Sequence, residues 1–448
     1  MGGAVRDALL GRPPAVDLDV AVAAGALRVA RRLADALGGA FVPLDVERGA
    51  ARVVAPGHRI DVADFRAPTL AGDLAARDFT VDALAVPLRD LLAHGRAPIV
   101  DPRGGLADLA ARRLRPAGPG VFAHDPVRTL RGVRLAAVLG FRLTPATAAA
   151  IRAAAPALAG VAAERVRDEV LAILAADGTA RALRTADRLG VLSVVFPEVE
   201  AMRRTRQPAP HRFDVLDHSL RAVSNCDRIL PRLTELRPFG AELASHVGEP
   251  LGGGVERRQI LKLAALLHDV SKPETRRRVG GRVRFFEHDV LGAARARAIG
   301  ERLRLPQRAT GVLERLVRHH LRPMHLAAAG AVTPRARYRF LRDLGPETRD
   351  LALLVLADAA AVRGTSPFRH WRHAALLHDL LAGWEEQRLT SPRAPLVRGE
   401  DVMTRFGLRP GPEIGRLLAR AREAQDLGLV GTREEALAYL GASDEALP

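Results

Sequence analysis

The pattern of polar and apolar positions changes along this chain near residue 115. Before that point, short runs that alternate polar and apolar residues stand between runs with helical spacing. Residues 16–22 alternate acidic and apolar side chains, which is typical of a half-buried strand. Residues 52–54 and 59–65 predict two further strands, and Pro56-Gly57 predicts the turn that joins them. The pattern therefore predicts a small sheet-containing head.

From about residue 122 onwards the spacing of apolar residues is helical almost throughout. Thr144-Pro145 predicts a helix N-cap followed by proline at the first helical position, and the glycine-rich residues 248–255 predict a loop. We expect an α+β fold in which the head, with a mixed sheet, precedes a long all-α body. The expected parts are residues 1–115, 116–205, 206–365 and 366–448.

The composition fits a globular protein, because 48% of the 448 residues are hydrophobic. The sequence contains no run of about 18 apolar residues, so we expect no membrane-spanning helix. The first residues lack the apolar stretch of a secretory signal. The single cysteine, Cys226, excludes an internal disulfide and favours a reducing compartment. We expect a cytoplasmic protein with no membrane partner and no obligate protein partner.

The net charge of +17 changes this picture, because such a surplus favours a polyanionic partner. Only Lys262 and Lys272 are lysines, so nearly every basic residue is arginine. With so much alanine and glycine, a GC-rich coding bias is the alternative origin of these arginines. Contact with nucleic acid is the interpretation that we carry forward.

Candidate chemistry in the head begins with two acids. Asp17 and Asp19 stand two apart on a predicted strand, so their carboxylates share one face, as a site for two divalent ions requires. Alone, such a pair is usually a surface feature. Here Gly2-Gly3 and Arg6 open a helical run nearby, and this arrangement suits phosphate. Asp61, on a later strand, is either a third carboxylate of the site or a surface acid at a strand end.

Five segments in order resemble the motifs of class II CCA-adding enzymes and bacterial poly(A) polymerases, which are polymerase-β-like nucleotidyltransferases. They are residues 2–19, 77–83, 101–115, 125–134 and 164–169. The resemblance implies that Asp17 and Asp19 bind magnesium (Mg²⁺) and that Gly3 and Arg6 contact the nucleotide. It also implies that further residues line the nucleotide site: Arg77, Asp125, Arg128, Arg131 and Arg134.

The chemistry of Asp125 and Arg128 can be argued independently. On a helix, positions three apart share a face, so we expect these side chains to lie together. Asp125 offers only acceptors and Arg128 only donors. Cytosine and adenine each present an amino donor beside a ring-nitrogen acceptor, whereas uracil and guanine present the reverse. The pair is therefore expected to accept C and A and to reject U and G, with a surface ion pair as the alternative.

Three features depart from the family's pattern. The chain begins at Met1, where the family usually has a strand leading into the double glycine. This departure indicates either a truncated or misassigned start or a head whose sheet lacks an edge strand. Asp82 stands where the family has asparagine, and its charge would repel a triphosphate unless a metal or an arginine compensates. His124 stands where glutamate often precedes the aspartate.

A second set of metal ligands lies in the body. An adjacent histidine and aspartate at a helix end, His268-Asp269, can bind one metal ion. The order of His218, His268-Asp269 and Asp358 resembles the ligands of HD-domain phosphohydrolases. His288 and His320 are candidates for a second metal or for substrate phosphate. Imidazole and carboxylate ligands suit a divalent transition metal such as manganese, nickel, cobalt or iron.

The function expected from these resemblances is addition of C and A to the 3′ end of tRNA from CTP and ATP. The HD domain at residues 206–365 is expected to add phosphohydrolase activity. Three alternatives remain open. One is a bacterial poly(A) polymerase, and the second is an enzyme that adds only CC or only A. The third is a phosphohydrolase or RNA-binding protein whose head is inactive.

Overall fold

The computed structural model describes residues 1–13, 17–330, 332–389 and 394–442. The chain forms two compact units, residues 1–201 with 302–305 and residues 202–301 with 306–448. Residue 16, where we expected the first strand to begin, lies outside the described residues.

The head contains the expected mixed sheet. Its strands are β1 (Asp17–Val22), β2 (Ala40–Asp45), β3 (Ala50–Ala55) and β4 (His58–Asp64), in the order β1-β4-β3-β2. β1 runs parallel to β4, and the other two pairs are antiparallel. The predictions at 52–54 and 59–65 correspond to β3 and β4. β2 was not predicted, because it carries a proline and its exposure does not alternate.

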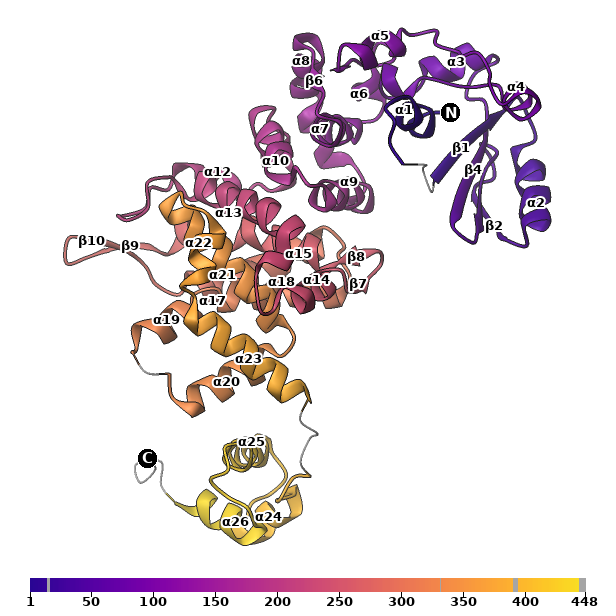
Figure 1. Ribbon diagram of the computed structural model, residues 1–448. Helices are drawn as coiled ribbons and strands as arrows, with labels where there is room; N and C mark the ends of the chain where they lie inside the picture. The colour runs from indigo at the N-terminus through magenta and orange to yellow at the C-terminus, as the bar shows by residue number, and fades with distance from the viewer. Residues whose placement is uncertain (14–16, 331, 390–393, 443–448) are drawn as a thin grey trace. The chain divides into compact units, whose positions relative to one another are not determined.

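One face of this sheet is covered by α2 (Ala26–Leu37), as Figure 1 shows. Ala26, Ala30 and Ala34 of that helix pack against apolar side chains of the strands, among them Val53 and Val62. Because successive strand residues point to opposite faces, the acids of β1 lie on the face away from α2. The packing that holds the sheet together therefore also fixes the direction of Asp17 and Asp19.

Helices make up most of the rest of the first unit. The Thr144 hydroxyl accepts a hydrogen bond from the Thr147 amide at 3.2 Å, which confirms the predicted N-cap. The elements are α1 (Gly3–Leu9), α3 (Leu70–Ala75), η1 (Thr80–Asp82), α4 (Leu88–His94), α5 (Gly105–Ala110), β5 (Arg113–Leu114), α6 (Val121–His124), α7 (Arg128–Leu139), β6 (Arg142–Leu143), α8 (Pro145–Ala154), η2 (Ala155–Gly160), α9 (Ala163–Ala175), α10 (Thr179–Arg188) and α11 (Val191–Val195), followed by α12 (Val199–Arg204).

The second unit is helical, with two short hairpins. Residues 248–255, predicted as a loop, contain most of the first hairpin, and residues 276–285 form the second within a region predicted to be helical. Its elements are α13 (Val215–Ile229), η3 (Leu230–Glu235), α14 (Gly240–Val247), β7 (Pro250–Gly252), β8 (Val255–Glu256), α15 (Arg257–Leu267), α16 (Lys272–Thr275), β9 (Arg276–Val279), β10 (Arg282–Phe285), α17 (His288–Arg302), α18 (Gln307–His319), α19 (Arg322–Ala328), α20 (Pro334–Leu344), α21 (Glu347–Arg363), α22 (Pro367–Arg372) and α23 (Ala375–Leu389).

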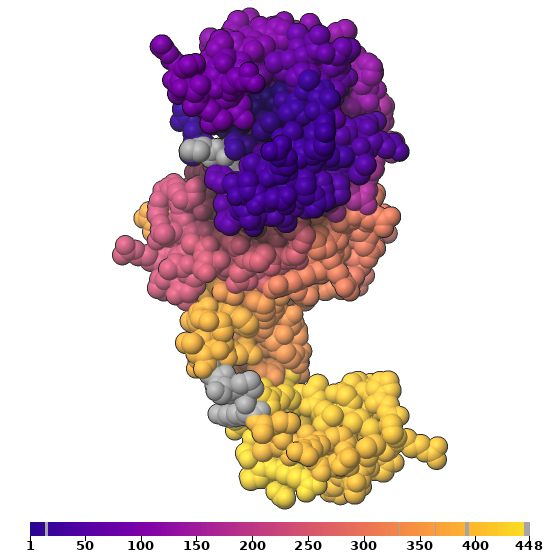
Figure 2. All heavy atoms as spheres, turned by 90° about the vertical axis from the view of Figure 1, so that its right-hand side faces the viewer, coloured from indigo at the N-terminus to yellow at the C-terminus, as the bar shows by residue number. Residues whose placement is uncertain are grey.

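The C-terminal helices have a small core of their own. They are α24 (Gly399–Phe406), α25 (Pro412–Asp426) and α26 (Arg433–Gly441), and their residues are yellow in Figure 2. Val402, Ala424 and Ala436 are fully buried among them. Across the described part of the chain, every helix is too short or too polar to cross a bilayer.

Candidate active sites

The charged face of the head sheet carries three acids and two arginines. The register pairs Asp19 with Asp61 and Asp17 with Arg59 across β1 and β4, so all four side chains share this face. Arg59 holds the Asp17 carboxylate at 2.6 and 3.0 Å, and Arg52 holds Asp61 at 2.7 and 2.9 Å. Asp19 has the loosest contact, with Arg77 at 4.0 Å, and is therefore the acid most available to a cation.

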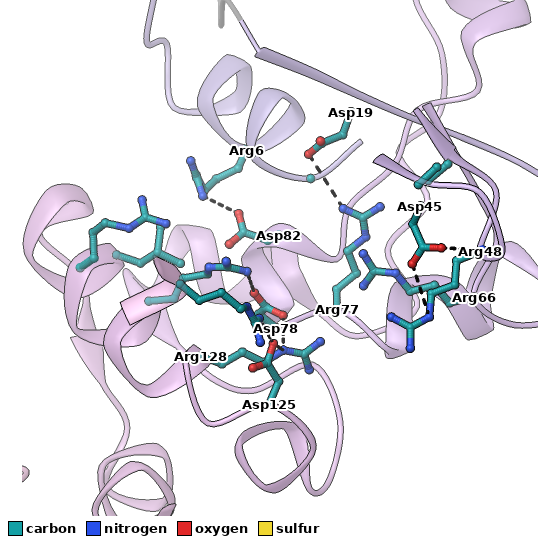
Figure 3. A pocket seen from close by; sticks show the side chains of 18 of the residues that line it. Arg6, Asp19, Asp45, Arg48, Arg66, Arg77, Asp78, Asp82, Asp125 and Arg128 are labelled. Carbon is teal, nitrogen blue, oxygen red and sulfur yellow. Dashed lines mark hydrogen bonds and ion pairs between the residues drawn. The ribbon is translucent and has the colours of Figure 1, made fainter. Parts of the chain in front are cut away.

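Asp19 faces a pocket of about 750 Å³ that is rich in arginine and aspartate (Figure 3). Asp17 and Asp61 lie outside its lining, in their pairs with Arg59 and Arg52. The pocket lies wholly within the first unit. Its lining residues are Gly2, Gly3, Arg6, Asp19, Asp45, Arg48, Ala50, Ala63, Asp64, Arg66, Arg77, Asp78, Asp82, Asp125, Arg128, Arg131, Arg134, Leu135 and Arg165.

The start of α1 closes one side of the pocket. Gly2 has φ +67°, and a Cβ built on it would come within 3.0 Å of an Asp19 carboxylate oxygen. Glycine at this position therefore lets the helix begin beside Asp19. Arg6 is buried and forms ion pairs with Asp7. Its ion pair with Asp82 is drawn in Figure 3.

Asp82 thus has the compensating arginine that its charge requires. Burial raises the pKa of the Asp82 carboxyl above its ordinary value, although the charge of Arg6 opposes that rise. The side chain that could bind phosphate, Arg6, is engaged with an acid on the pocket wall.

Asp125 and Arg128 both line the pocket, but the helical argument for their proximity was wrong. Asp125 is extended and ends α6, whereas Arg128 begins α7. The Arg128 amide donates to the Asp125 carbonyl at 3.1 Å, and this turn brings the side chains to 3.7 Å. Arg165 of α9 holds one Asp125 oxygen at 2.7 Å. The other, Oδ1, is buried with no hydrogen-bond partner among the described residues.

The electrostatics keep Asp125 in the form that accepts hydrogen bonds. Partial burial favours the neutral acid, but Arg165, with help from Arg128, holds the pKa of Asp125 below its ordinary value. An ionised carboxylate with a free buried oxygen can accept a bond from the amino group of a base.

Arg131 and Arg134 extend the pocket along α7. Both donate to Glu169 of α9 at 2.8 Å, and Arg131 also pairs with Asp78. Burial works against the charge of Arg131, yet Asp78 and Glu169 raise its pKa above the ordinary value. Asp78 further pairs with Arg128 at 2.6 Å. The basic side chains that the sequence assigned to the nucleotide are thus held in position by acids.

A second candidate site lies in the other unit, where three elements converge. His218 comes from α13, His268 and Asp269 from the end of α15, and Asp358 from α21. The His218 Nε2 atom lies 2.9 Å from Asp358 Oδ1 and 3.3 Å from His268 Nε2. His218, His268 and Asp358 place three ligand atoms within 4.8 Å of one another.

Asp269, His288 and His320 form a second group of three ligand atoms within 4.8 Å. Asp269 Oδ1 lies 3.4 Å from His288 Nε2 and 3.6 Å from His320 Nε2. Asp269 Oδ2 lies 3.2 Å from His268 Nε2. Asp269 therefore stands between the two groups with one oxygen toward each.

The histidine rings are oriented as metal ligands are. The Nδ1 atoms of His268, His288 and His320 lie 2.7 to 3.0 Å from backbone carbonyls. An N–H donated there leaves each Nε2 lone pair facing the centre. Within the described chain, Asp269 Oδ1, Asp358 Oδ1 and two of these Nε2 atoms are buried without a hydrogen-bond partner, so a cation fits this donor set.

Asp269 and Asp358 also change the pKa of the neighbouring His268. Burial would lower the pKa of His268, but Asp269 and Asp358 raise it to about 9. Lys272 contributes a further positive charge, with its Nζ 2.7 Å from Asp269 Oδ2. The two carboxylates give this buried site a negative charge that a divalent ion can balance.

Known protein families match successive parts of this chain. Residues 1–70 match the poly(A) polymerase head domain, residues 140–203 match the "Probable RNA and SrmB-binding site of polymerase A", and residues 215–362 match the HD domain. An A-adding tRNA nucleotidyltransferase of Deinococcus radiodurans is 39% identical, over 100% of this chain and 96% of that protein. This chain is a class II CCA-adding/poly(A) polymerase family nucleotidyltransferase with an HD domain.

Two further relatives are consistent with this family. A CC-adding tRNA nucleotidyltransferase of Geobacter sulfurreducens is 34% identical, over 100% of this chain and 92% of that protein. A solved structure of a CCA-adding enzyme with ATP has the same fold, with a TM-score of 0.62 and 21% identity over 99% of this chain and 90% of that chain. The expected fold class, a mixed-sheet head followed by a helical body with an HD domain, is confirmed.

Several residues of this nucleotidyltransferase's sites were not assigned from sequence. Asp78 and Arg165 line the pocket, and Glu169 binds Arg131 of the lining; all three lie inside the quoted motifs but received no role. In the HD site the unassigned residues are Lys272 and His211, whose ring lies 5.3 Å from that of His218. The basic residues assigned to the nucleotide need acidic partners when they are buried, and that need was the available signal for Asp78 and Glu169.

Proposed function

We propose that this tRNA nucleotidyltransferase adds both C and A to the 3′ end of tRNA, using CTP and ATP. Asp19, with Asp17 once it is released from Arg59, would hold Mg²⁺, and Asp61 would support the site from the neighbouring strand. Bound Mg²⁺ would activate the 3′ hydroxyl for attack on the α-phosphorus and stabilise the pyrophosphate that leaves. Gly3, Arg6 and Arg77 lie where they can position the phosphates.

The observation that carries the proposal is the Asp125 and Arg128 pair in the same pocket as Asp19. Asp125 Oδ1 is a free acceptor, and the Arg128 guanidinium lies beside it. One acceptor beside one donor matches the shared edge of cytosine and adenine. Solved structures of CCA-adding enzymes with CTP and with ATP have this fold, as does one with tRNA.

The test is to incubate tRNA ending before, within and after CCA with each nucleoside triphosphate. The products are read at single-nucleotide resolution. Addition of C to the first tRNA and of A to the tRNA ending in CC supports the proposal. Long A tails would identify a poly(A) polymerase, and no addition to any of them would identify an inactive head.

Addition of A alone is the second candidate, because the A-adding enzyme of Deinococcus radiodurans matches this chain over its whole length. In the same assay, tRNA ending in CC would then gain A, while tRNA ending before CCA would gain nothing. Addition of CC alone, as the name of the Geobacter enzyme describes, gives the opposite pattern.

Changing Asp125 or Arg128 to alanine is expected to relax base choice as well as slow addition. Each change removes half of the recognition of the base edge, so the preference for CTP and ATP over UTP and GTP should fall by about tenfold or more. Ratios of kcat/KM for the four nucleotides measure this preference. Arg152→Ala, an exposed change on α8, is the control. Slower addition with unchanged base preference would contradict the assignment.

Changing Asp82 to asparagine is expected to lower KM for the nucleotide by on the order of fivefold, or about 1 kcal/mol. The change removes a negative charge from the pocket wall and frees Arg6 to contact phosphate. Asp7→Asn is the matched control, because Asp7 also pairs with Arg6 but is not among the lining residues. KM for CTP and ATP is measured by steady-state kinetics. A KM that stays the same or rises in the Asp82 variant would contradict the idea that Asp82 weakens nucleotide binding.

We further propose that the HD domain is a metal-dependent phosphohydrolase. His218, His268, Asp269 and Asp358 would hold a divalent transition metal, and His288 and His320 would extend the site to a second ion or to substrate phosphate. A phosphorylated RNA end, such as a 2′,3′-cyclic phosphate, is the proposed substrate class. If water attacks the phosphorus and the P–O3′ bond breaks, the phosphate stays on the 2′ oxygen and the 3′ hydroxyl that nucleotide addition needs becomes free.

A further inference from the structure

The second hairpin of the HD unit is unusually basic. β9 and β10 with their Gly280-Gly281 turn hold five arginines and no acid in ten residues. All five are exposed, and Figure 1 shows the hairpin extending from the helices of its unit. We call residues 276–286 the arginine arm. Its arginines are Arg276, Arg277, Arg278, Arg282 and Arg284.

Acids of the described chain do not neutralise these arginines. Across the described residues, none of the five forms an ion pair with a carboxylate, and Arg277 bonds only to the Glu274 and Arg276 carbonyls. By contrast, the nearby Arg295 pairs with Glu274 at 2.9 Å. The arm is therefore a concentration of free positive charge rather than part of a surface ion-pair network.

The pairing of the two strands increases the repulsion. The register places Arg277 directly opposite Arg284, and like charges at opposed positions destabilise a sheet. A two-stranded hairpin is marginally stable even without such a pair. A polyanion bound along the arm would relieve this repulsion, so the arm is better suited to a bound state than to the free protein.

The base of the arm is joined to the HD metal site. The Phe285 carbonyl lies 2.8 Å from Nδ1 of His288, and the Phe285 ring packs 6.4 Å from the His288 ring. The Lys272 ammonium lies 5.6 Å from the centre of the same Phe285 ring. A strand of phosphates that follows the arm to its base therefore arrives beside the metal ligands.

An aromatic residue stands at that base. Phe286 is 58% exposed and lines a hollow of about 570 Å³ with Arg277, Glu287, Val290 and Leu291. An exposed ring beside arginines is the combination by which proteins hold single-stranded nucleic acid, because any base can stack on it while the arginines contact phosphate.

From these observations we propose that the arginine arm binds single-stranded RNA and guides its phosphorylated 3′ end into the HD site. This inference rests on the proposed phosphohydrolase activity only for the delivery step; RNA binding by the arm stands independently. An anionic membrane is the other polyanionic surface to consider. The arm fits it poorly, because alternation places Arg276 and Arg278 on one face and Arg277, Arg282 and Arg284 on the other.

Binding is tested first, with the full-length protein and a fluorescent 12-nucleotide single-stranded RNA that carries a 3′ phosphate. Hydrogen exchange of residues 276–286 should slow when RNA is added. Arg278→Glu/Arg282→Glu, two exposed changes at the tip of the hairpin, should lower affinity at least about tenfold and reduce the salt slope by about 1.4. Arg258→Glu/Arg308→Glu, also exposed in this unit, is the control with the same change in charge.

Delivery is tested by kinetics on two substrates, an RNA ending in a 2′,3′-cyclic phosphate and bis(p-nitrophenyl) phosphate, which is too small to need the arm. The ratio of kcat/KM for the RNA to kcat/KM for the small ester should fall at least about tenfold in the tip variant. It should stay constant in the control variant.

Each outcome has a separate meaning. If the wild type hydrolyses neither substrate, the phosphohydrolase proposal fails, and exchange protection still decides whether the arm binds RNA. The proposal that the arm binds RNA would be overturned if RNA leaves the hydrogen exchange of residues 276–286 unchanged and the tip and control variants bind RNA equally well. If the protein binds phosphatidylserine vesicles more tightly than RNA, and the tip variant loses this binding, the arm contacts a membrane. That result would also overturn the proposal that the arm binds RNA.

Discussion

Replacing Asp19 by alanine is expected to reduce nucleotide addition by at least about a thousandfold, or about 4 kcal/mol of barrier. Asp19 is the acid of the charged sheet face that lines the pocket, and its contact with Arg77 is loose enough for a cation to enter. The Asp19 side chain is 49% exposed, so its loss should change the free energy of unfolding by less than about 0.5 kcal/mol.

Single-turnover addition to tRNA at saturating nucleotide and Mg²⁺ measures the effect, and thermal unfolding checks the fold. Asp35→Ala, an exposed acid of α2 on the opposite side of the sheet, is the control. Asp17→Ala should also abolish addition, even though Asp17 pairs with Arg59. Near-normal nucleotide addition by the Asp19 variant would contradict the assignment of Asp19 to the catalytic site of the head.

The second large effect is expected in the HD site. Changing His268 and Asp269 together to alanine should abolish hydrolysis of the cyclic phosphate and leave nucleotide addition within about twofold of the wild type. Asp269 stands between both ligand groups, so its loss disrupts each of them. Removal of metal with a chelator should give the same loss, and manganese, nickel, cobalt or iron should restore activity better than magnesium.

Both residues are fully buried, so the double change requires a check on folding. Asp358→Asn is the gentler variant, since it keeps the shape of the side chain and removes one metal ligand. Metal content, hydrolysis and addition are measured on both. Hydrolysis that persists in a folded, metal-free variant contradicts the metal site, whereas a folded variant that also loses addition contradicts the independence of the two activities.

Much of the head site could be predicted because strands and helices have fixed periods. Two acids at positions two apart on a strand share a face whatever the rest of the fold does, and this placed Asp17 beside Asp19. The His268-Asp269 pair at the end of an apolar helix was recognisable for the same reason.

The partners of these residues could not be predicted, because they depend on register between distant segments. Arg59 reaches Asp17 from 42 positions away, and Arg165 reaches Asp125 from 40 positions away. Local spacing contains no information about which arginine lies opposite which acid. The arginine arm was missed for a different reason, since a strand made largely of arginine shows no alternation of hydrophobicity.

Strand β1 contributes side chains to both the core and the active site, and this limits where insertions and deletions can be tolerated. Val20 and Val22 pack toward α2, while Asp17 and Asp19 point the other way from the same six residues. Inserting or deleting one codon within the strand would exchange the two sets and turn an acid into the core. Insertions should instead be tolerated at Pro56-Gly57, the exposed turn that joins β3 to β4, because neither residue lines the pocket. Natural relatives are therefore expected to vary in length at that turn and to keep the length of β1 constant.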